Sequence, residues 1–170
     1  MKNEPIHVLF LCTRNAARSI MAEACLRALG RAQYVAFSAG TWPTEDGLPD
    51  AMTLQVLESV GLPATNLRSK SWEEFSAEGA PRIDIVITLC DAVADEPCPV
   101  WAAHPDAVHW SYPDPAMLKG SEQVRLDAYR ATLHAIRWRV ELLANLPVGK
   151  LENFAVAEFA QGLAQVPVRA

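Results

Sequence analysis

The sequence of 170 residues has no apolar run approaching the roughly 18 residues that a membrane-spanning helix requires. It has no block rich in Lys and Arg, and its net charge is −5. The first five residues lack the apolar core of a secretion signal. These absences argue against a membrane span and against a general basic surface for nucleic acid or anionic membranes. We therefore expect a cytoplasmic protein that recognises any anion locally.

The sequence also lacks Gly/Ser-rich linkers and internal repeats, and it contains only four cysteines. A chain of this length with 51% hydrophobic residues can bury one proper core. So few thiols indicate chemical or packing roles rather than a structural disulfide framework. The sequence predicts a single domain over residues 1–150. A helical tail over 151–170 then either packs back on that domain or joins a partner subunit.

Short apolar runs alternate with helical patterns along the chain. Each run is bounded by Gly, Pro, Asn or Asp, as is typical of strands in a parallel sheet. The order predicts an α/β domain whose parallel sheet is covered on both faces. The expected strands are 7–12, 33–38, 83–90 and 107–112, and the expected helices are 19–30, 51–60, 71–78 and 121–145.

One stretch near the start joins an apolar run to a Cys and an Arg. The run ends at Cys12, five residues intervene, and Arg18 and Ser19 open a helical pattern. A strand-to-helix turn of this kind gathers unpaired backbone N–H groups around a concave space of partial positive charge. Arg18 adds a planar two-pronged donor, and the same field favours the thiolate of Cys12. The stretch therefore predicts a loop that both binds and attacks an oxyanion.

The other three cysteines differ in their surroundings. Cys25 belongs to the apolar stripe of the first helix and is expected to fill the core. Cys90 follows a strand, at the sheet edge where open parallel sheets place ligands, and Cys98 lies in an acidic, Pro-rich segment, so these two could exchange disulfides. A zinc site formed by both with His104 and His109 is disfavoured, because seven residues separate the two cysteines, whereas structural zinc prefers two to four.

Asp114 stands between two prolines after the fourth predicted strand. Its backbone is restricted on both sides, so its carboxyl group is rigidly presented at the same sheet edge. A nucleophile that displaces oxygen from a tetrahedral oxyanion needs a proton donor for the departing group. We expect Asp114 to be that general acid.

These residues carry a resemblance. The segments are CTRNAARSIMAEA at 12–24, SAGTWP at 38–43, LRSKSWEEF at 67–75, VITLCDAVADEPCPVW at 86–101 and HWSYPDPA at 109–116. Together they resemble the arsenate reductase branch of the low-molecular-weight protein tyrosine phosphatase superfamily over about residues 7–146. The resemblance implies a three-layer fold with a four-stranded parallel sheet and helices on both faces.

The resemblance also implies roles for individual residues. Cys12 would attack arsenate, Asp114 would act as the acid, and the loop residues Thr13, Arg14, Asn15, Ala16, Ala17, Arg18 and Ser19 would hold the oxyanion, with phosphate or sulfate as analogues. Cys90 would then form a disulfide with Cys12, which Cys98 would open to give Cys90–Cys98. Thioredoxin or a glutathione/glutaredoxin system would be the external reductant, with no tightly bound cofactor and no metal.

Several positions depart from the family pattern or stay open. Arg14 stands where the family often has Gly, so a left-handed backbone there would cost about 1 kcal/mol. Trp42 either overhangs the site or caps the core, and Arg130, Arg137 and Arg139 are expected on a solvated helix face.

Two other functions compete with arsenate reduction. One is hydrolysis of phosphotyrosine or a small phosphoester by the same residues, although Ala116 and Met117 replace the aromatic residues that usually follow the Asp-Pro pair in such phosphatases. The other is an oxyanion-binding or redox-sensing module without turnover. Reductase activity needs the additional thiols that hydrolysis does not.

Overall fold

The computed structural model describes residues 4–90, 107–147 and 153–168. Its centre is a sheet of four parallel strands in the order β2-β1-β3-β4, which confirms the predicted architecture. The strands are β1 (Ile6–Cys12), β2 (Tyr34–Gly40), β3 (Ile85–Thr88) and β4 (Ala107–His109). β1 lies in the middle, and all seven of its residues pair with β2. Its last residue is Cys12, so the nucleophile predicted from the sequence stands at the carboxyl edge of the sheet.

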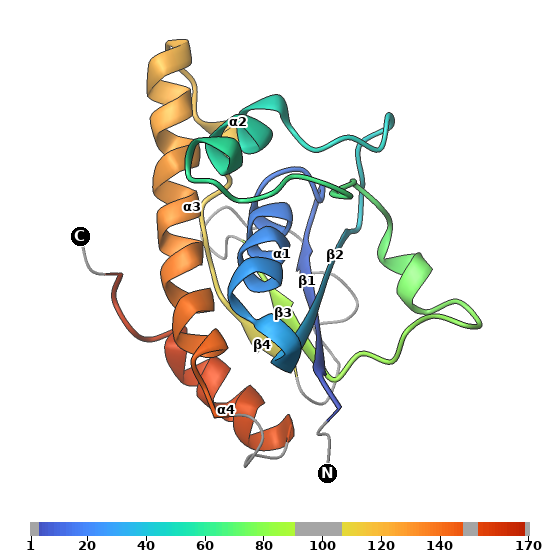
Figure 1. Ribbon diagram of the computed structural model, residues 1–170. Coiled ribbons are helices and arrows are strands. Elements are labelled where there is room, and N and C mark those ends of the chain that lie inside the picture. Colours follow the sequence, from blue (N-terminus) through green and yellow to red (C-terminus); the bar gives the residue numbers. More distant parts are fainter. Residues whose placement is uncertain (1–3, 91–106, 148–152, 169–170) are drawn as a thin grey trace.

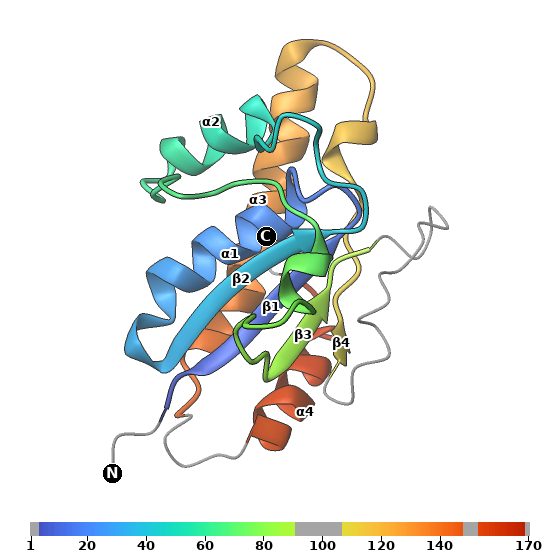
Figure 2. The same ribbon diagram turned by 90° about the vertical axis from the view of Figure 1, so that its right-hand side faces the viewer.

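Three helices pack together on one face of the sheet, as Figures 1 and 2 show. They are α1 (Arg18–Leu29), α2 (Ala51–Ser59) and α3 (Glu122–Ala144). The alternate residues Val8 and Phe10 of β1 point into this main core. α1 is buried over most of its length because it lies between the sheet and α3.

The opposite face of the sheet has a smaller apolar cluster. Leu9 and Leu11 of β1 pack there with Val86 and with Phe75. Phe75 comes from a short 3-10 helix, Trp72–Phe75, whose N-cap Ser71 accepts a hydrogen bond from the N–H of Glu73. The sequence predicted a helix here through about residue 78, but the structure forms only one 3-10 turn, which ends at Phe75 with Ser76 as its C-cap.

The last helix, α4 (Asn153–Leu163), packs against β4 and α3. Figure 1 shows it near the amino terminus, at the end of the sheet opposite α2. The indole of Trp110 donates a hydrogen bond of 2.8 Å to the carbonyl of Ala160, one of the last four carbonyls of α4, which have no partner within the helix. The tail therefore packs back on the domain, which is one of the two predicted alternatives.

Arg139 corrects an expectation. The sequence placed it on a solvated face of α3, but its side chain is 8% exposed, with its guanidinium 4.9 Å from the ring centroid of Tyr112. It also donates to the carbonyl of Ala164, beyond the end of α4. The helical pattern of α3 was predicted correctly, but the burial of Arg139 depends on the tail covering it. Arg130 is exposed as expected.

Two strands are shorter than predicted. β3 ends at Thr88 rather than at Cys90, and β4 ends at His109 rather than at Tyr112. Single hydrogen bonds extend both ladders, since Leu89 N–H donates to Leu11 and Trp110 N–H donates to Thr88. Across the described ranges, no helix combines the length and apolarity that a bilayer crossing requires.

Candidate active site

Residues outside the turn between β1 and α1 hold it in place by donating hydrogen bonds to its carbonyl groups. Thr13 C=O accepts from the N–H of Trp42, and Arg14 C=O accepts from the hydroxyl of Ser69. Ala16 C=O accepts both the N–H of Asp50 and the hydroxyl of Thr53. Within one trans peptide plane the C=O and N–H groups point in opposite directions, so carbonyls fixed outward favour amides that face the concave side of the turn. Such amides are the donors that the predicted anion cradle requires.

The left-handed residue of the turn is Asn15, with φ of 49°, and not Arg14. The strain expected at Arg14 is therefore absent, because Asn tolerates this conformation better than most residues. Close packing of the turn has a second requirement. A Cβ atom at Gly40 would come within 2.6 Å of the Thr13 carbonyl oxygen and 2.9 Å of the Asn15 nitrogen, so only glycine fits there.

A chain of buried hydrogen bonds leads to the sulfur of Cys12. Asn15 Nδ2 donates to the hydroxyls of Ser19 and Ser38, and Asn15 Oδ1 accepts from the N–H of Lys70. Ser19 Oγ lies 2.8 Å from Cys12 Sγ. Ser19 already accepts from Asn15, and its hydroxyl can either donate to the sulfur or accept from it. The sulfur of Cys12 therefore has a buried hydroxyl partner.

The far end of this chain is a buried ion cluster that the sequence analysis missed. Glu23 is 1% exposed and accepts from Ser38 and from Arg27. The ammonium of Lys70 lies 3.8 Å from Glu23. Burial lowers the pKa of Lys70, and the carboxylate of Glu23 opposes that effect. The sequence indicated this cluster only weakly, because Glu23 and Lys70 lie 47 positions apart along the chain.

Arg18 and Asp114 meet at the carboxyl edge of the sheet. Arg18 is 2% exposed, and its Nη1 donates to the carbonyls of Leu89 and Tyr112 at 3.1 Å each. Its Nη2 lies 3.5 Å from Asp114 Oδ2. Asp114 Oδ1 accepts from the N–H of Ala116, which fixes the carboxyl group at the start of a short 3-10 helix, Pro115–Met117. Both side chains are thus held in place by backbone groups.

One small pocket brings the predicted residues together. Its cavity of about 10 Å³ has about the volume that holds one water molecule. Cys12, Arg18 and Asp114 line it from three different segments of the chain. The complete lining is Cys12, Arg14, Ala16, Ala17, Arg18, Asp50, Asp114 and Ala116. Such a pocket suits a compact anion rather than a large organic group.

The remaining thiols are placed as follows. Cys90 is fully buried and directly follows Leu89, whose carbonyl holds Arg18. Cys98 lies outside the described residues, so the structure does not show its relation to Cys90. Cys25 is fully buried in the main core, where burial raises its pKa to about 12, which confirms the prediction of a packing role.

Two further expectations concern Trp42 and zinc. Trp42 is 72% exposed beside the turn, so it does not cap the core. Within the described ranges, no three His, Cys, Asp or Glu side chains are placed to hold a metal ion. His109 Nδ1 lies 2.6 Å from the hydroxyl of Thr88, and the other proposed ligand, His104, lies outside those ranges.

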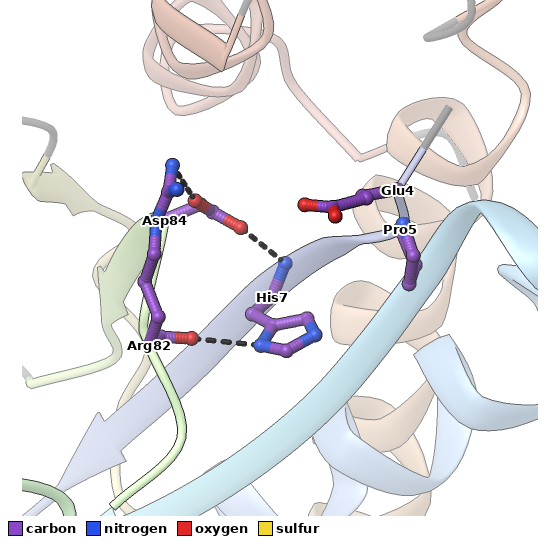
Figure 3. A pocket seen from close by; sticks show the side chains of 5 residues that line it. All are labelled: Glu4, Pro5, His7, Arg82 and Asp84. Atoms are coloured by element: carbon purple, nitrogen blue, oxygen red, sulfur yellow. Dashed lines mark hydrogen bonds and ion pairs between the residues drawn. The ribbon is translucent and has the colours of Figure 1, made fainter. Parts of the chain in front are cut away.

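A much larger pocket lies at the opposite edge of the sheet, as Figure 3 shows. It has a volume of about 550 Å³ and is lined by Glu4, Pro5, His7, Arg82 and Asp84. Its polar groups bond to one another: His7 donates through its backbone N–H to Asp84 and through Nδ1 to the carbonyl of Arg82. Its lining includes no cysteine, and both carboxylate oxygens of Asp84 are engaged by Arg82 and by the His7 N–H, so we do not regard it as the reactive site.

Comparison with known proteins identifies the family of the chain. The family model described as low molecular weight phosphotyrosine protein phosphatase matches residues 7–152. The chain belongs to that family. Among its curated relatives, an arsenate reductase of Bacillus subtilis is 34% identical over 124 residues, covering 72% of this chain and 82% of the relative. An arsenate reductase of Halalkalibacterium halodurans is 28% identical and covers 81% of this chain and 94% of the relative.

Solved structures give the same family fold. An arsenate reductase from Archaeoglobus fulgidus matches with a TM-score of 0.65 and 27% identity, covering 82% of this chain and 99% of that one. An arsenate reductase in a phosphate-binding state matches with a TM-score of 0.61 and 26% identity, covering 82% and 96%. The arginine phosphatase YwlE of Geobacillus stearothermophilus has a TM-score of 0.63 but 21% identity, covering 82% and 91%, and shows the shared fold alone.

Proposed function

We propose that this member of the phosphatase family is an arsenate reductase. One observation carries the proposal: Cys12, Arg18 and Asp114 line a single pocket, and a second thiol, Cys90, directly follows a residue whose carbonyl binds Arg18. The named relatives support the choice of arsenate, and the phosphate-binding state of one of them supports an oxyanion substrate.

The first step is attack by the Cys12 thiolate on arsenic. The amides of residues 13–19 and the guanidinium of Arg18 hold the arsenate oxygens, and Arg14 adds charge at the rim. Asp114 gives its proton to the departing oxygen, which leaves as water. The product is a Cys12–S–As(V) adduct, in which no electrons have yet been transferred.

The second step supplies two electrons. Cys90 attacks the Cys12 sulfur, the S–As bond breaks, and arsenic leaves as arsenite with the bonding pair. The enzyme now holds a Cys12–Cys90 disulfide. Cys98 attacks Cys90 and releases the Cys12 thiolate, and the resulting Cys90–Cys98 disulfide is reduced by an external dithiol, either thioredoxin or the glutathione/glutaredoxin system. The reducing cytoplasm keeps such thiols available.

The site also supports a second function, hydrolysis of a phosphoester. Cys12, Arg18 and Asp114 would serve both reactions, and the fold is shared with phosphatases. Ala116 lines the pocket, and Met117 is 76% exposed, so this position offers no aromatic grip for a phenyl ring. We further propose that residues 1–150 form the catalytic domain and that 151–170 form its helical tail.

The decisive experiment measures arsenite production from arsenate with thioredoxin or glutaredoxin supplied. Cys90→Ser and Cys98→Ser are each expected to abolish multiple turnover while retaining hydrolysis of p-nitrophenyl phosphate. Cys25→Ala is the matched control, because it removes a thiol that the reaction does not use. Full arsenate turnover in either of the first two variants would contradict the cascade. Hydrolysis without any arsenite in the parent would favour the phosphatase.

A further inference from the structure

The active-site pocket contains a second carboxyl group that the reaction above does not use. Asp50 lines the same cavity as Cys12, Arg18 and Asp114. It is the N-cap residue of α2, yet its side chain makes no capping hydrogen bond. Its backbone N–H donates to the Ala16 carbonyl at 3.0 Å, which fixes the residue against the anion-binding turn. An Asp at this position usually caps the helix through its side chain, but the Asp50 side chain does not.

Tyr129 of α3 holds this carboxyl group in place. Its phenol donates a hydrogen bond of 2.8 Å to Asp50 Oδ2. Tyr129 is 3% exposed, and burial, followed by the bond to Asp50, raises its pKa well above the usual range. The phenol therefore stays protonated and acts as a permanent donor. Its position is set by the apolar stripe of α3, so Asp50 is held by a rigid element.

The two carboxyl groups of the pocket differ in what remains available to a ligand. Asp114 uses Oδ2 with Arg18 and Oδ1 with the N–H of Ala116. Among the residues that the structure describes, the carboxyl group of Asp50 is hydrogen-bonded only through Oδ2, which accepts from Tyr129. Its second oxygen is left to accept a hydrogen bond in a pocket that Arg14 and Arg18 also line.

An acceptor in this position discriminates between tetrahedral anions. Arsenate and phosphate carry at least one proton at neutral pH, and an O–H group can donate to a carboxylate. Sulfate carries none, so each of its oxygens would face the Asp50 carboxylate as one negative charge against another. Specificity of this kind arises from a repulsive contact with the wrong ligand as much as from an attractive one with the right ligand.

We propose that Asp50, positioned by Tyr129, accepts a hydrogen bond from the protonated oxygen of the bound oxyanion and thereby makes the pocket bind sulfate more weakly than phosphate. The inference deepens the proposed function, since it assigns the anion selectivity of the same pocket. Asp50 is a specificity residue that contacts the ligand, and Tyr129 is a positioning residue that acts through it.

The test measures dissociation constants of inorganic phosphate and sulfate for the reduced full-length protein by titration calorimetry at neutral pH. Asp50→Asn keeps an N-cap residue and so preserves α2. We expect it to tighten sulfate binding about tenfold, because a hydrogen bond to a charged group changes an affinity by about tenfold or more. Phosphate binding should change less than about threefold. Tyr129→Phe should shift the phosphate-to-sulfate ratio in the same direction by about threefold.

Glu45→Gln is the matched control for charge. Glu45 is exposed in the neighbouring groove with Arg14, and its loss removes one negative charge outside the pocket. It should alter both anions equally and leave their ratio unchanged. Sulfate binding that is undetectable in the parent and measurable in Asp50→Asn also supports the inference.

Three results would overturn the inference. They are an unchanged phosphate-to-sulfate ratio in Asp50→Asn, a shift of that ratio in Glu45→Gln equal to the shift in Asp50→Asn, and a parent that binds neither anion. The binding assay does not depend on turnover. A protein with the expected ratio but without arsenate reduction would refute only the proposed function. One that reduces arsenate with a ratio independent of Asp50 would refute only the selectivity.

Discussion

Among the described residues, each edge of the sheet carries one arginine–aspartate pair, and the two pairs are built in opposite ways. At the carboxyl edge, Arg18 is 2% exposed and Asp114 is 21% exposed, with 3.5 Å between nitrogen and oxygen. At the amino edge, Arg82 is 78% exposed and Asp84 is 8% exposed, with 2.7 Å between them. The tighter pair lies in the larger pocket, and the looser pair lies in the reactive one.

The difference shows what a ligand site requires. Arg82 and Asp84 satisfy each other, and Asp84 also accepts from the backbone of His7, so little is left for a ligand. Nη1 of Arg18 is fixed by two carbonyls. Its Nη2 and Asp114 Oδ2 lie 3.5 Å apart, which leaves both able to interact with a bound oxygen.

The largest expected effect comes from Arg18→Lys, which should lower kcat/KM for arsenate about 10³-fold. An ammonium cannot reproduce two fixed donors toward an oxyanion while also bonding two carbonyls. The matched change at the other edge, Arg82→Lys, should leave kcat/KM unchanged. Steady-state assays of both variants provide the measurement, and equal losses would remove the distinction between the two edges.

Asp114→Asn should lower kcat about 10²-fold, because the departing oxygen loses its proton donor. Phosphate binding should persist, since the cradle of amides and Arg18 remains. The comparison is between kcat and the phosphate dissociation constant. A variant that retains the parental kcat would show that another group supplies the proton.

Asp84→Asn should leave kcat unchanged and lower the free energy of unfolding by about 1–2 kcal/mol. The amide can still accept from the His7 N–H, but this hydrogen bond loses the charge assistance that the carboxylate gives it. Urea denaturation of the parent and the variant, together with the arsenate assay, tests this. A loss of activity without loss of stability would indicate a functional role for the amino-edge pocket.

The smallest effect is expected from Arg82→Ala, with a change below about 0.5 kcal/mol in the free energy of unfolding. The arginine is mostly exposed, and solvent-exposed ion pairs contribute little. Denaturation in low and high salt provides the check. A large destabilisation that salt abolishes would mean that this pair is more strongly coupled than its exposure indicates.

The sequence predicted the sheet and the turn well, because both depend on local patterns. An apolar run ending in Cys12, followed by small residues and Arg18, specifies a strand, a turn and a helix within about twenty residues. The exact position of the reversal stayed open: the left-handed residue is Asn15 rather than Arg14, and the order of small residues does not reveal where a turn reverses.

What could not be predicted depends on contacts between distant segments. Asp50 and Tyr129 are 79 residues apart, and the sequence assigned one to a helix start and the other to an apolar stripe. A partial signal existed, since a buried tyrosine requires a partner for its hydroxyl. Arg139 followed the helical pattern expected of a surface residue, and only the tail folding over it makes it buried.

The contact between α4 and β4 also bears on how the protein behaves at high concentration. β4 is an outer strand, and an outer strand with unpaired N–H groups is a template onto which another chain can add. The side chain of Gln161 accepts the N–H of His109, and α4 lies along this margin. The tail thus occupies one N–H group of this outer strand that another chain could otherwise bind, independently of any role in chemistry.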